Sequence, residues 1–337
     1  MEPQVLADFL SRLETFSHEF GGVWLCPDKK SNYYYYKGDA PETAIFALRD
    51  WPEVIRVEHE SAPPHDVSHQ GSLTIKLDDV EIGANNFEII AGPCSVEDYE
   101  SLLVTAKHLA QSGVQLLRAG AFKPRTSPYS FQGLGVKGLE ILESVRNETG
   151  LQIVTEVLDP RDMEAVADVS DILQIGSRNM SNTNLLKEVG KLDKPVLLKR
   201  GMAATVKEFL YAAEYVATSG NSRIILCERG LRHFDPEIRN ILDLSIVPLL
   251  KQKTHLPVFV DPSHGTGRSD LVPQMMLAAT AASADGLLVE VHNNPQASWS
   301  DAEQAISVSE FNKTLLPLNA ILEISGRKLS RSPLVLS

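Results

Sequence analysis

Eight short apolar runs alternate with segments long enough for a helix each, and this repetition constrains the fold more than any other feature of the chain. Continuous apolar runs are typical of parallel strands that are buried on both faces. Eight strand–helix units are the number that closes into a barrel, so we expect an α/β fold of the (β/α)8 TIM-barrel class. The predicted strands are FEIIAGPCS, VQLLRAG, LQIVTEV, ILQIG, PVLLKRG, RIILCERG, LPVFVDPS and GLLVEVH.

The same alternation is also compatible with an open, doubly wound sheet. That fold often carries a glycine-rich dinucleotide turn after its first strand, and no such turn follows FEIIAGPCS. The barrel is therefore the favoured interpretation. A barrel needs about 250 residues, and the chain has 337, so a small additional domain is expected.

The N-terminal part of the chain predicts this small domain. Over residues 1–58 an amphipathic helix is followed by a β-β-α-β succession, which we interpret as a truncated ferredoxin-like α+β unit. Residues 59–71 are rich in Pro, His and Ser and predict an exposed linker. The barrel is expected over residues 72–337, with a hairpin around Asp78 and Asp79 that plugs its N-terminal mouth.

The bulk composition excludes several classes of protein. A net charge of −12 opposes non-specific binding to nucleic acid or to an anionic membrane. No apolar stretch approaches the roughly 20 residues of a membrane span, and no signal peptide opens the chain, so a cytoplasmic protein is expected. Three scattered cysteines, Cys26, Cys94 and Cys227, are too few for a disulfide scaffold.

Four side chains suited to metal binding lie at or after the ends of the predicted first, seventh and eighth strands, which are neighbours in a closed barrel. A thiolate, an imidazole and two carboxylates suit a divalent ion such as Mn, Fe, Zn or Co better than Mg or Ca. Each residue alone has a simpler interpretation, as a small buried thiol, a hydrogen-bonded histidine or a helix N-cap. The coincidence of all four favours a metal site. The predicted ligands are Cys94, His264, Glu290 and Asp301, the last at the start of the final long helix.

Cations gather at the same predicted end of the barrel. In an acidic protein such a group indicates a multiply charged anion, for example a phosphorylated carboxylic acid. The alternative is ordinary pairing with acids such as Glu156 and Glu228. The long loop AFKPRTSPYSFQGLG is either a second phosphate clamp or a solvated lid. The cations are Arg118, Lys123, Arg178, Lys199, Arg200 and Arg229.

Seven motifs in order carry a resemblance to a known family: AGPCSVE, LRAGAFKPRTSPYSFQGLG, QIGSRNM, LLKRG, LCERG, VDPSHGTG and VEVH. From about residue 72 to 325 the chain resembles the 3-deoxy-D-arabino-heptulosonate 7-phosphate (DAHP) synthases of the type I beta subgroup. The resemblance implies the four metal ligands above. It also implies that phosphoenolpyruvate is bound by Arg118, Lys123, Arg178, Lys199 and Arg229, and the phosphate of erythrose 4-phosphate by Arg125 and Thr126.

The implied reaction is a metal-dependent, aldol-like condensation that opens the shikimate pathway of aromatic amino acid biosynthesis. Lys123 is the candidate for proton transfer to the aldehyde oxygen, and Glu156 for orienting the attacking water. Relatives that make 3-deoxy-octulosonate 8-phosphate lack the complete Lys-Pro-Arg-Thr sequence of residues 123–126, which favours the four-carbon aldose. A synthase with a different phosphorylated aldose and a catalytically silent, metabolite-sensing barrel are the alternatives.

The resemblance further implies a homodimer or homotetramer, and an N-terminal domain that binds an aromatic amino acid as feedback inhibitor. The N-terminal residues depart from the family pattern, because the first strand of the domain is missing and NYYYYKG is unfamiliar. The run from Tyr33 to Tyr36 is compatible with an inhibitor pocket or a subunit contact. A strand with aromatic faces is the interpretation we favour.

Overall fold

The computed structural model describes residues 3–25, 34–38, 40–54, 66–68, 71, 73–78, 80–125 and 127–331. The chain divides into two compact units, Met1–Ala62 and Pro63–Ser337. None of the described helices combines the length and the apolar character that crossing a membrane requires.

The N-terminal unit contains α1 (Pro3–Phe20), β1 (Val23–Leu25), β2 (Tyr35–Lys37) and α2 (Glu42–Ala47). The two strands pair antiparallel, with Trp24 opposite Tyr36. The side chains of Phe9, Leu13 and Phe16 share one buried face of α1, as the helical period requires, and the Phe16 ring packs on those of Trp24 and Tyr36. The strand expected from the tyrosine run is confirmed for β2, whereas Tyr33, Cys26 and most of the predicted third strand lie outside the described residues.

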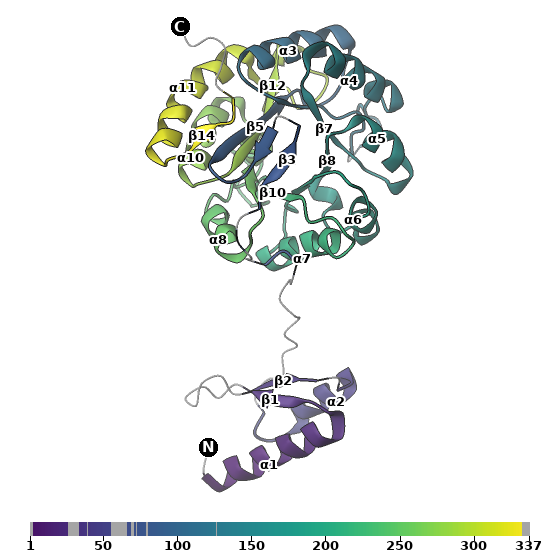
Figure 1. Cartoon of the computed structure of the whole chain (residues 1–337), viewed down its shortest axis with the longest axis vertical. Helices are drawn as coiled ribbons and strands as arrows, with labels where there is room; N and C mark the ends of the chain where they lie inside the picture. Colours follow the sequence, from purple (N-terminus) through teal and green to yellow (C-terminus); the bar gives the residue numbers. More distant parts are fainter. Residues whose placement is uncertain are drawn as a thin grey trace. The chain divides into compact units, whose positions relative to one another are not determined.

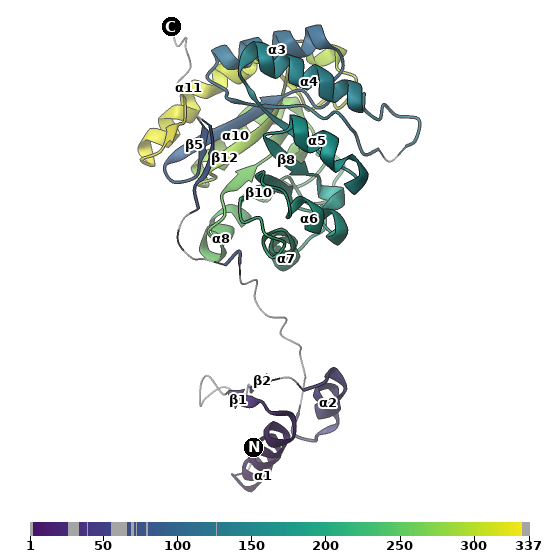
Figure 2. The same cartoon turned by 45° about the vertical axis from the view of Figure 1, so that its right-hand side comes forward.

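The second unit is a closed barrel of eight parallel strands, as the apolar runs predict. Neighbouring strands pair in sequence order, and β12 returns to β5 with Glu290 opposite Gly92. Figure 1 looks into the barrel, and Figures 1 and 2 show its helices around the outside of the sheet. The strands are β5 (Asn86–Gly92), β6 (Leu116–Arg118), β7 (Gln152–Glu156), β8 (Ile172–Ile175), β9 (Val196–Lys199), β10 (Ile224–Glu228), β11 (Val258–Val260) and β12 (Gly286–His292).

Each strand is followed by a helix that packs its apolar face on the sheet, and the apolar layer between them is the larger of two core clusters. The last strand is followed by the two-residue strand β13 (Ile306–Ser307) before its helix, and β14 (Lys328–Leu329) pairs with the start of β5. The helices are α3 (Tyr99–Gln111), α4 (Val136–Thr149), α5 (Met163–Val169), α6 (Thr183–Val189), α7 (Val206–Ala217), α8 (Ile246–Lys253), α9 (Pro262–Thr266), α10 (Val272–Ala281) and α11 (Val308–Ile324).

The predicted hairpin is present as β3 (Ile75–Leu77) and β4 (Val80–Ile82), which pair antiparallel. Its side chains Ile75, Val80 and Ile82 form a second core cluster with residues that point into the barrel, among them Ile90 and Phe259. Figure 1 shows β3 across the centre of the barrel. The hairpin therefore plugs the barrel with apolar side chains and leaves the opposite end to polar residues.

Candidate active site

The four predicted metal ligands lie together at the C-terminal end of the barrel. Their ligand atoms are all within 4.8 Å of one another. Cys94 Sγ is 2.9 Å from Asp301 Oδ2, and His264 Nε2 is 3.4 Å from Glu290 Oε1. Donor atoms bound to one ion at about 2.0–2.3 Å are separated by up to roughly 4.5 Å, so this cluster has the dimensions and the chemistry of a four-donor site.

One detail of the sequence interpretation is wrong. Asp301 does not open the last long helix, because α11 begins at Val308 with Ser307 as its N-cap. Asp301 instead lies in the loop after β12, with a left-handed backbone (φ 54°). The serine and glutamate of a capping box, Ser307 and Glu310, start the helix, and Ser307 lies six residues after Asp301 in the sequence.

His264 is oriented by a short helix that the strand pattern did not predict. Asp261 is the N-cap of α9, Pro262 occupies its first turn, and the Asp261 carboxylate accepts a hydrogen bond from the backbone N–H of His264. The other carboxylate oxygen is 2.8 Å from His264 Nδ1, which leaves Nε2 for the cluster. Burial lowers the pKa of His264 to about 4, so the imidazole is neutral, as a metal ligand must be.

Glu290 is buried and held from two sides. Arg118 Nη1 donates to Oε1 at 2.8 Å, and Gln304 Nε2 donates to Oε2 at 2.8 Å. Burial opposes ionisation, but the positive charges of His264 when protonated and of Arg118 lower the pKa of Glu290. The carboxylate is therefore charged and fixed. Gln304 and Asp261 are site residues that sequence reasoning missed, although Asp261 stands in the motif VDPSHGTG as a visible N-cap before proline.

Cys94 lies two residues beyond β5, in a segment that continues along the sheet. The backbone N–H of Gly120 donates to Cys94 O at 3.1 Å, and Lys123 Nζ lies 2.9 Å from Sγ. Burial, reinforced by the charge of Glu290, raises the pKa of the Cys94 thiol to about 12. A divalent cation would favour the thiolate by the opposite electrostatic effect.

Four of the predicted anion-binding residues surround this cluster. Arg118, Lys199 and Arg229 are each 4% exposed, and Lys123 is half-buried. Lys199 Nζ pairs with Asp261. Arg229 Nη1 is buried without a hydrogen-bond partner among the residues that the structure describes. A buried, unpaired guanidinium N–H is costly, so an anionic ligand that accepted its hydrogen bond would lower the free energy of this site.

The remaining predicted cations have different surroundings. Arg178 is exposed, and its Nη1 donates to the carbonyl of Pro124 at 3.2 Å. Arg200 is not part of the anion site, because its Nη1 is occupied by Glu228 at 3.0 Å and Asp243 at 3.1 Å. The alternative of ordinary ion pairing is correct for this residue.

The loop after β6 carries the predicted aldose-phosphate residues and projects from the barrel (Figure 2). Arg125 Nη1 is 4.0 Å from Asp301 Oδ2, and its Nε donates to Phe131 O at 2.8 Å. Thr126 lies outside the described residues. The loop therefore brings Arg125, as well as Lys123, to the edge of the cluster.

A small cavity of about 10 Å³ lies beside the cluster, and Cys94, Arg118, Lys123 and Glu156 are among the residues that line it. Glu156 is 8% exposed and accepts a hydrogen bond from Gln174 Nε2 at 3.1 Å. The absence of a side chain at residue 176 makes room for this carboxylate, since a Cβ on Gly176 would be 2.0 Å from Glu156 Oε1. The geometry brings Glu156 next to the cations, as a residue that acts on a substrate there would need.

Comparisons with known proteins show which family the chain belongs to. A family model described as the DAHP synthetase I family matches residues 61–323. The chain is 47% identical over 292 residues to a phospho-2-dehydro-3-deoxyheptonate aldolase of Thermotoga maritima, which covers 87% of this chain and 83% of that protein. A crystal structure of the Thermotoga maritima enzyme, also described as DAHP synthase, superimposes with a TM-score of 0.86 at 41% identity, covering 96% of each chain.

A second kind of relative is more distant. The chain is 34% identical over 265 residues to a 2-dehydro-3-deoxyphosphooctonate aldolase of Syntrophotalea carbinolica, which covers 74% of this chain and 95% of that protein. The heptonate relative is thus similar over a longer part of the chain and at higher identity.

Proposed function

The chain belongs to the DAHP synthetase I family, and on that premise we propose that the cluster around Cys94 is the catalytic centre of a 3-deoxy-7-phosphoheptulonate synthase. The enzyme condenses phosphoenolpyruvate with erythrose 4-phosphate and releases phosphate, the first step of the shikimate pathway. The observation that carries the proposal for the site is the meeting of four metal-binding side chains, with ligand atoms within 4.8 Å, beside buried arginines and a lysine.

We propose that Cys94, His264, Glu290 and Asp301 hold one divalent ion, and that the ion is Mn, Fe, Zn or Co. When bound, the ion would supply a Lewis acid that polarises the aldehyde of erythrose 4-phosphate. The protein groups around it keep each ligand in one orientation. Asp261 fixes the tautomer of His264, and Arg118 with Gln304 fixes Glu290.

Phosphoenolpyruvate carries a phosphate and a carboxylate, and both need cationic partners. The proposed partners are Arg118, Lys123, Arg178, Lys199 and Arg229. Arg229 supports this assignment most directly, because its buried Nη1 has no hydrogen-bond partner in the part of the chain that the structure describes. The buried cations among them, Arg118, Lys199 and Arg229, would hold the substrate in one pose. Orientation of two reactants can lower a barrier by roughly 7–11 kcal/mol.

The bond changes in the condensation define roles for Lys123 and Glu156. The enol carbon of phosphoenolpyruvate forms a bond with the aldehyde carbon, and Lys123 donates a proton to the aldehyde oxygen. Water oriented by Glu156 adds to the resulting cationic carbon, and the C–O bond to phosphate then breaks. Lys123 Nζ lies 2.9 Å from Cys94 Sγ, which is close to where the aldehyde oxygen would be polarised. Arg125 and Thr126 are the proposed partners of the aldose phosphate.

Phosphate release tests this proposal directly. Purified protein is incubated with Mn²⁺, phosphoenolpyruvate and either erythrose 4-phosphate or arabinose 5-phosphate, and we expect release with the four-carbon sugar. The Cys94→Ser variant should lose this activity. Cys227→Ser is the matched control, because Cys227 is equally buried but points into the barrel interior. Release with arabinose 5-phosphate alone would instead indicate an octulosonate synthase.

We also propose an organisation for the whole protein. Residues 1–58 form a regulatory domain that binds an aromatic amino acid, residues 59–71 a linker and residues 72–337 the catalytic barrel. The protein acts in the cytoplasm as a homodimer or homotetramer. Activity measured with added Phe, Tyr or Trp tests the first statement, and light scattering during gel filtration tests the assembly. Unchanged activity with all three amino acids contradicts the regulatory role.

A further inference from the structure

Asp301 is held differently from the other three residues of the cluster. Glu290 lies in β12, His264 in α9, and the backbone of Cys94 is bonded to Gly120. Asp301 lies in a loop, with φ 54°. A left-handed backbone is unfavourable for a non-glycine residue, so neighbouring contacts must hold this conformation.

The neighbours of Cys94 and Asp301 in the sequence are directly bonded to each other. Ser95 Oγ and Ser300 Oγ are 2.7 Å apart, and the two residues are 0% and 5% exposed. Ser95 immediately follows Cys94, and Ser300 immediately precedes Asp301. This hydroxyl pair therefore joins the two chain segments whose side chains meet at 2.9 Å in the cluster.

Glu97 supports the same loop from the side of β5. Its Oε1 accepts from the backbone N–H of Trp299 at 2.7 Å, and the Ser298 hydroxyl lies 3.0 Å from the same oxygen. His292 Nδ1 accepts from the backbone N–H of Asn294, so in the neutral ring the proton is on Nε2, which lies 3.3 Å from Glu97 Oε2. Glu97 and His292 are buried, at 6% and 3% exposed. Their hydrogen bonds are therefore shielded from water and hold the loop in place.

We propose that Ser95 and Ser300, braced by Glu97, are positioning residues that set the separation of Cys94 and Asp301 before a metal ion binds. The proposal rests on the function proposed above, that the cluster is a metal site. Without the hydroxyl pair, the Asp301 loop can adopt more conformations. Binding of the ion must then order the loop, which lowers the affinity for the ion. The pair thus acts on metal affinity through the loop and touches neither the ion nor the substrates.

Titration with Co²⁺ tests this proposal. Full-length protein is freed of metal with a chelator and titrated with Co²⁺, and thiolate-to-cobalt absorption reports binding at Cys94. We expect Ser300→Ala to lower the affinity about tenfold, the size typical for residues that support metal ligands. Ser95→Ala should have the same effect. The double variant should lose about tenfold and not a hundredfold, because both single changes break one shared bond.

The control is Ser170→Ala. Ser170 is also fully buried, but its hydroxyl donates to the carbonyl of Val166 at the end of α5. It should bind Co²⁺ as the wild-type protein does. Phosphate release by Ser300→Ala should fall at limiting Co²⁺ and recover when Co²⁺ is in excess. If one serine variant does not fold, as judged by circular dichroism, the variant of the other serine breaks the same hydrogen bond and serves as the test.

Two outcomes overturn the proposal, and they are distinguishable. Wild-type affinity and absorption in a folded Ser300→Ala or Ser95→Ala protein, or additive losses in the double variant, remove the positioning role and leave the proposed metal site standing. Absence of any Cys94-dependent absorption in the wild-type protein removes the metal site and the positioning role together.

Discussion

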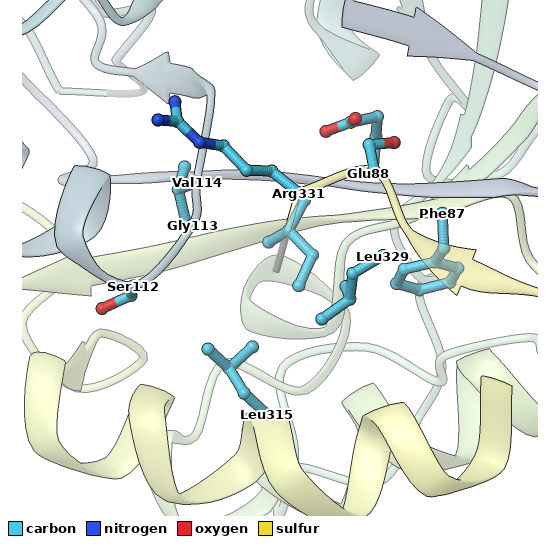
Figure 3. A pocket seen from close by; sticks show the side chains of 10 residues that line it. Phe87, Glu88, Ser112, Gly113, Val114, Leu315, Leu329 and Arg331 are labelled. Carbon is cyan, nitrogen blue, oxygen red and sulfur yellow. The ribbon is translucent and has the colours of Figure 1, made fainter. Parts of the chain in front are cut away.

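The two ends of the barrel treat buried polar groups in opposite ways. At the C-terminal end, Glu290 lies between Arg118 and Gln304, and Arg229 Nη1 lacks an acceptor among the described residues. At the N-terminal end, hairpin residues such as Ile82 fill the barrel. There Glu88 is a buried carboxyl beside a small cavity that apolar side chains such as Leu315 and Leu329 line together with Arg331 (Figure 3). Charged side chains are concentrated at the C-terminal end, where a bound substrate can supply the partners that they lack. The N-terminal end serves stability.

Removal of the histidine in the cluster should give the largest effect. We expect His264→Ala to lower the rate of phosphate release at least about 1,000-fold, because several kcal/mol of transition-state stabilisation by a bound ion would be lost. Thermal unfolding should change little. His255→Ala is the matched control at the other end of the barrel, where His255 Nδ1 contacts Ser68 O. Equal loss of activity in both variants would contradict the conclusion that catalysis depends on the C-terminal end of the barrel alone.

Truncation of the plug should give the second-largest effect, on stability alone. Ile82 is fully buried in the cluster inside the barrel. Ile82→Ala removes packed methylene groups and leaves a cavity, which should lower the free energy of unfolding by about 3–4 kcal/mol. Urea denaturation measures this loss, and kcat of the folded fraction should stay at the wild-type value. Val136→Ala, at a site that is 60% exposed, should cost about 0.5 kcal/mol or less.

A change in the residue that orients His264 should be weaker than loss of the ligand itself. Asp261→Asn places an N–H donor where His264 and Lys199 both need an acceptor. We expect divalent-ion affinity to fall about 10- to 100-fold, with partial recovery of activity in excess ion. Titration with Mn²⁺ measures the change. Asp159→Asn, at the half-buried N-cap of the 3-10 turn Pro160–Asp162, is the control. An Asp261→Asn protein with wild-type affinity would contradict the orienting role.

The sequence predicted the barrel well because buried strands carry the strongest periodic signal that a chain offers. All eight runs form strands, and the ligand atoms of Cys94, His264, Glu290 and Asp301 meet because parallel strands end at one face. Loop geometry was less accessible. The left-handed backbone of Asp301 depends on contacts across about 200 residues of sequence.

Supporting residues were missed for the same reason. Gln304 carries no pattern that links it to Glu290, because their contact depends on how the loop after β12 returns to the barrel. Asp261 was accessible in principle as an N-cap before proline. Arg200 was grouped with the other cations of this end, and ion pairing was left open as the alternative, because a sequence places cations at a strand end but does not say which of them have acidic partners. Its contact with Asp243 is set by a loop 43 residues further along the chain.

Glu88 should give the smallest effect, and it depends on pH. Burial raises the pKa of Glu88 to about 7, and the nearby Ser330 hydroxyl and Ile89 backbone offset only part of this rise. The folded protein therefore binds a proton between pH 4.5 and 7 that the unfolded chain releases, so the free energy of unfolding falls as pH rises through this window. This rise in the pKa of Glu88 corresponds to a change of roughly 3 kcal/mol in the free energy of unfolding. Water that enters the adjacent cavity of about 10 Å³ should reduce the change.

Glu88→Gln should therefore be more stable than the wild-type protein at pH 8, by about 1–2 kcal/mol, and nearly equal to it at pH 4.5. Urea denaturation across this range measures the difference, and Glu140→Gln, on the exposed face of α4, should show none. Because Glu88 lies at the N-terminal end, KM and kcat should not change with this substitution. A wild-type stability that rises between pH 5 and 7 relative to Glu88→Gln would reverse the sign of this argument, since it would show a carboxylate stabilised by partners, as at the opposite end of the barrel.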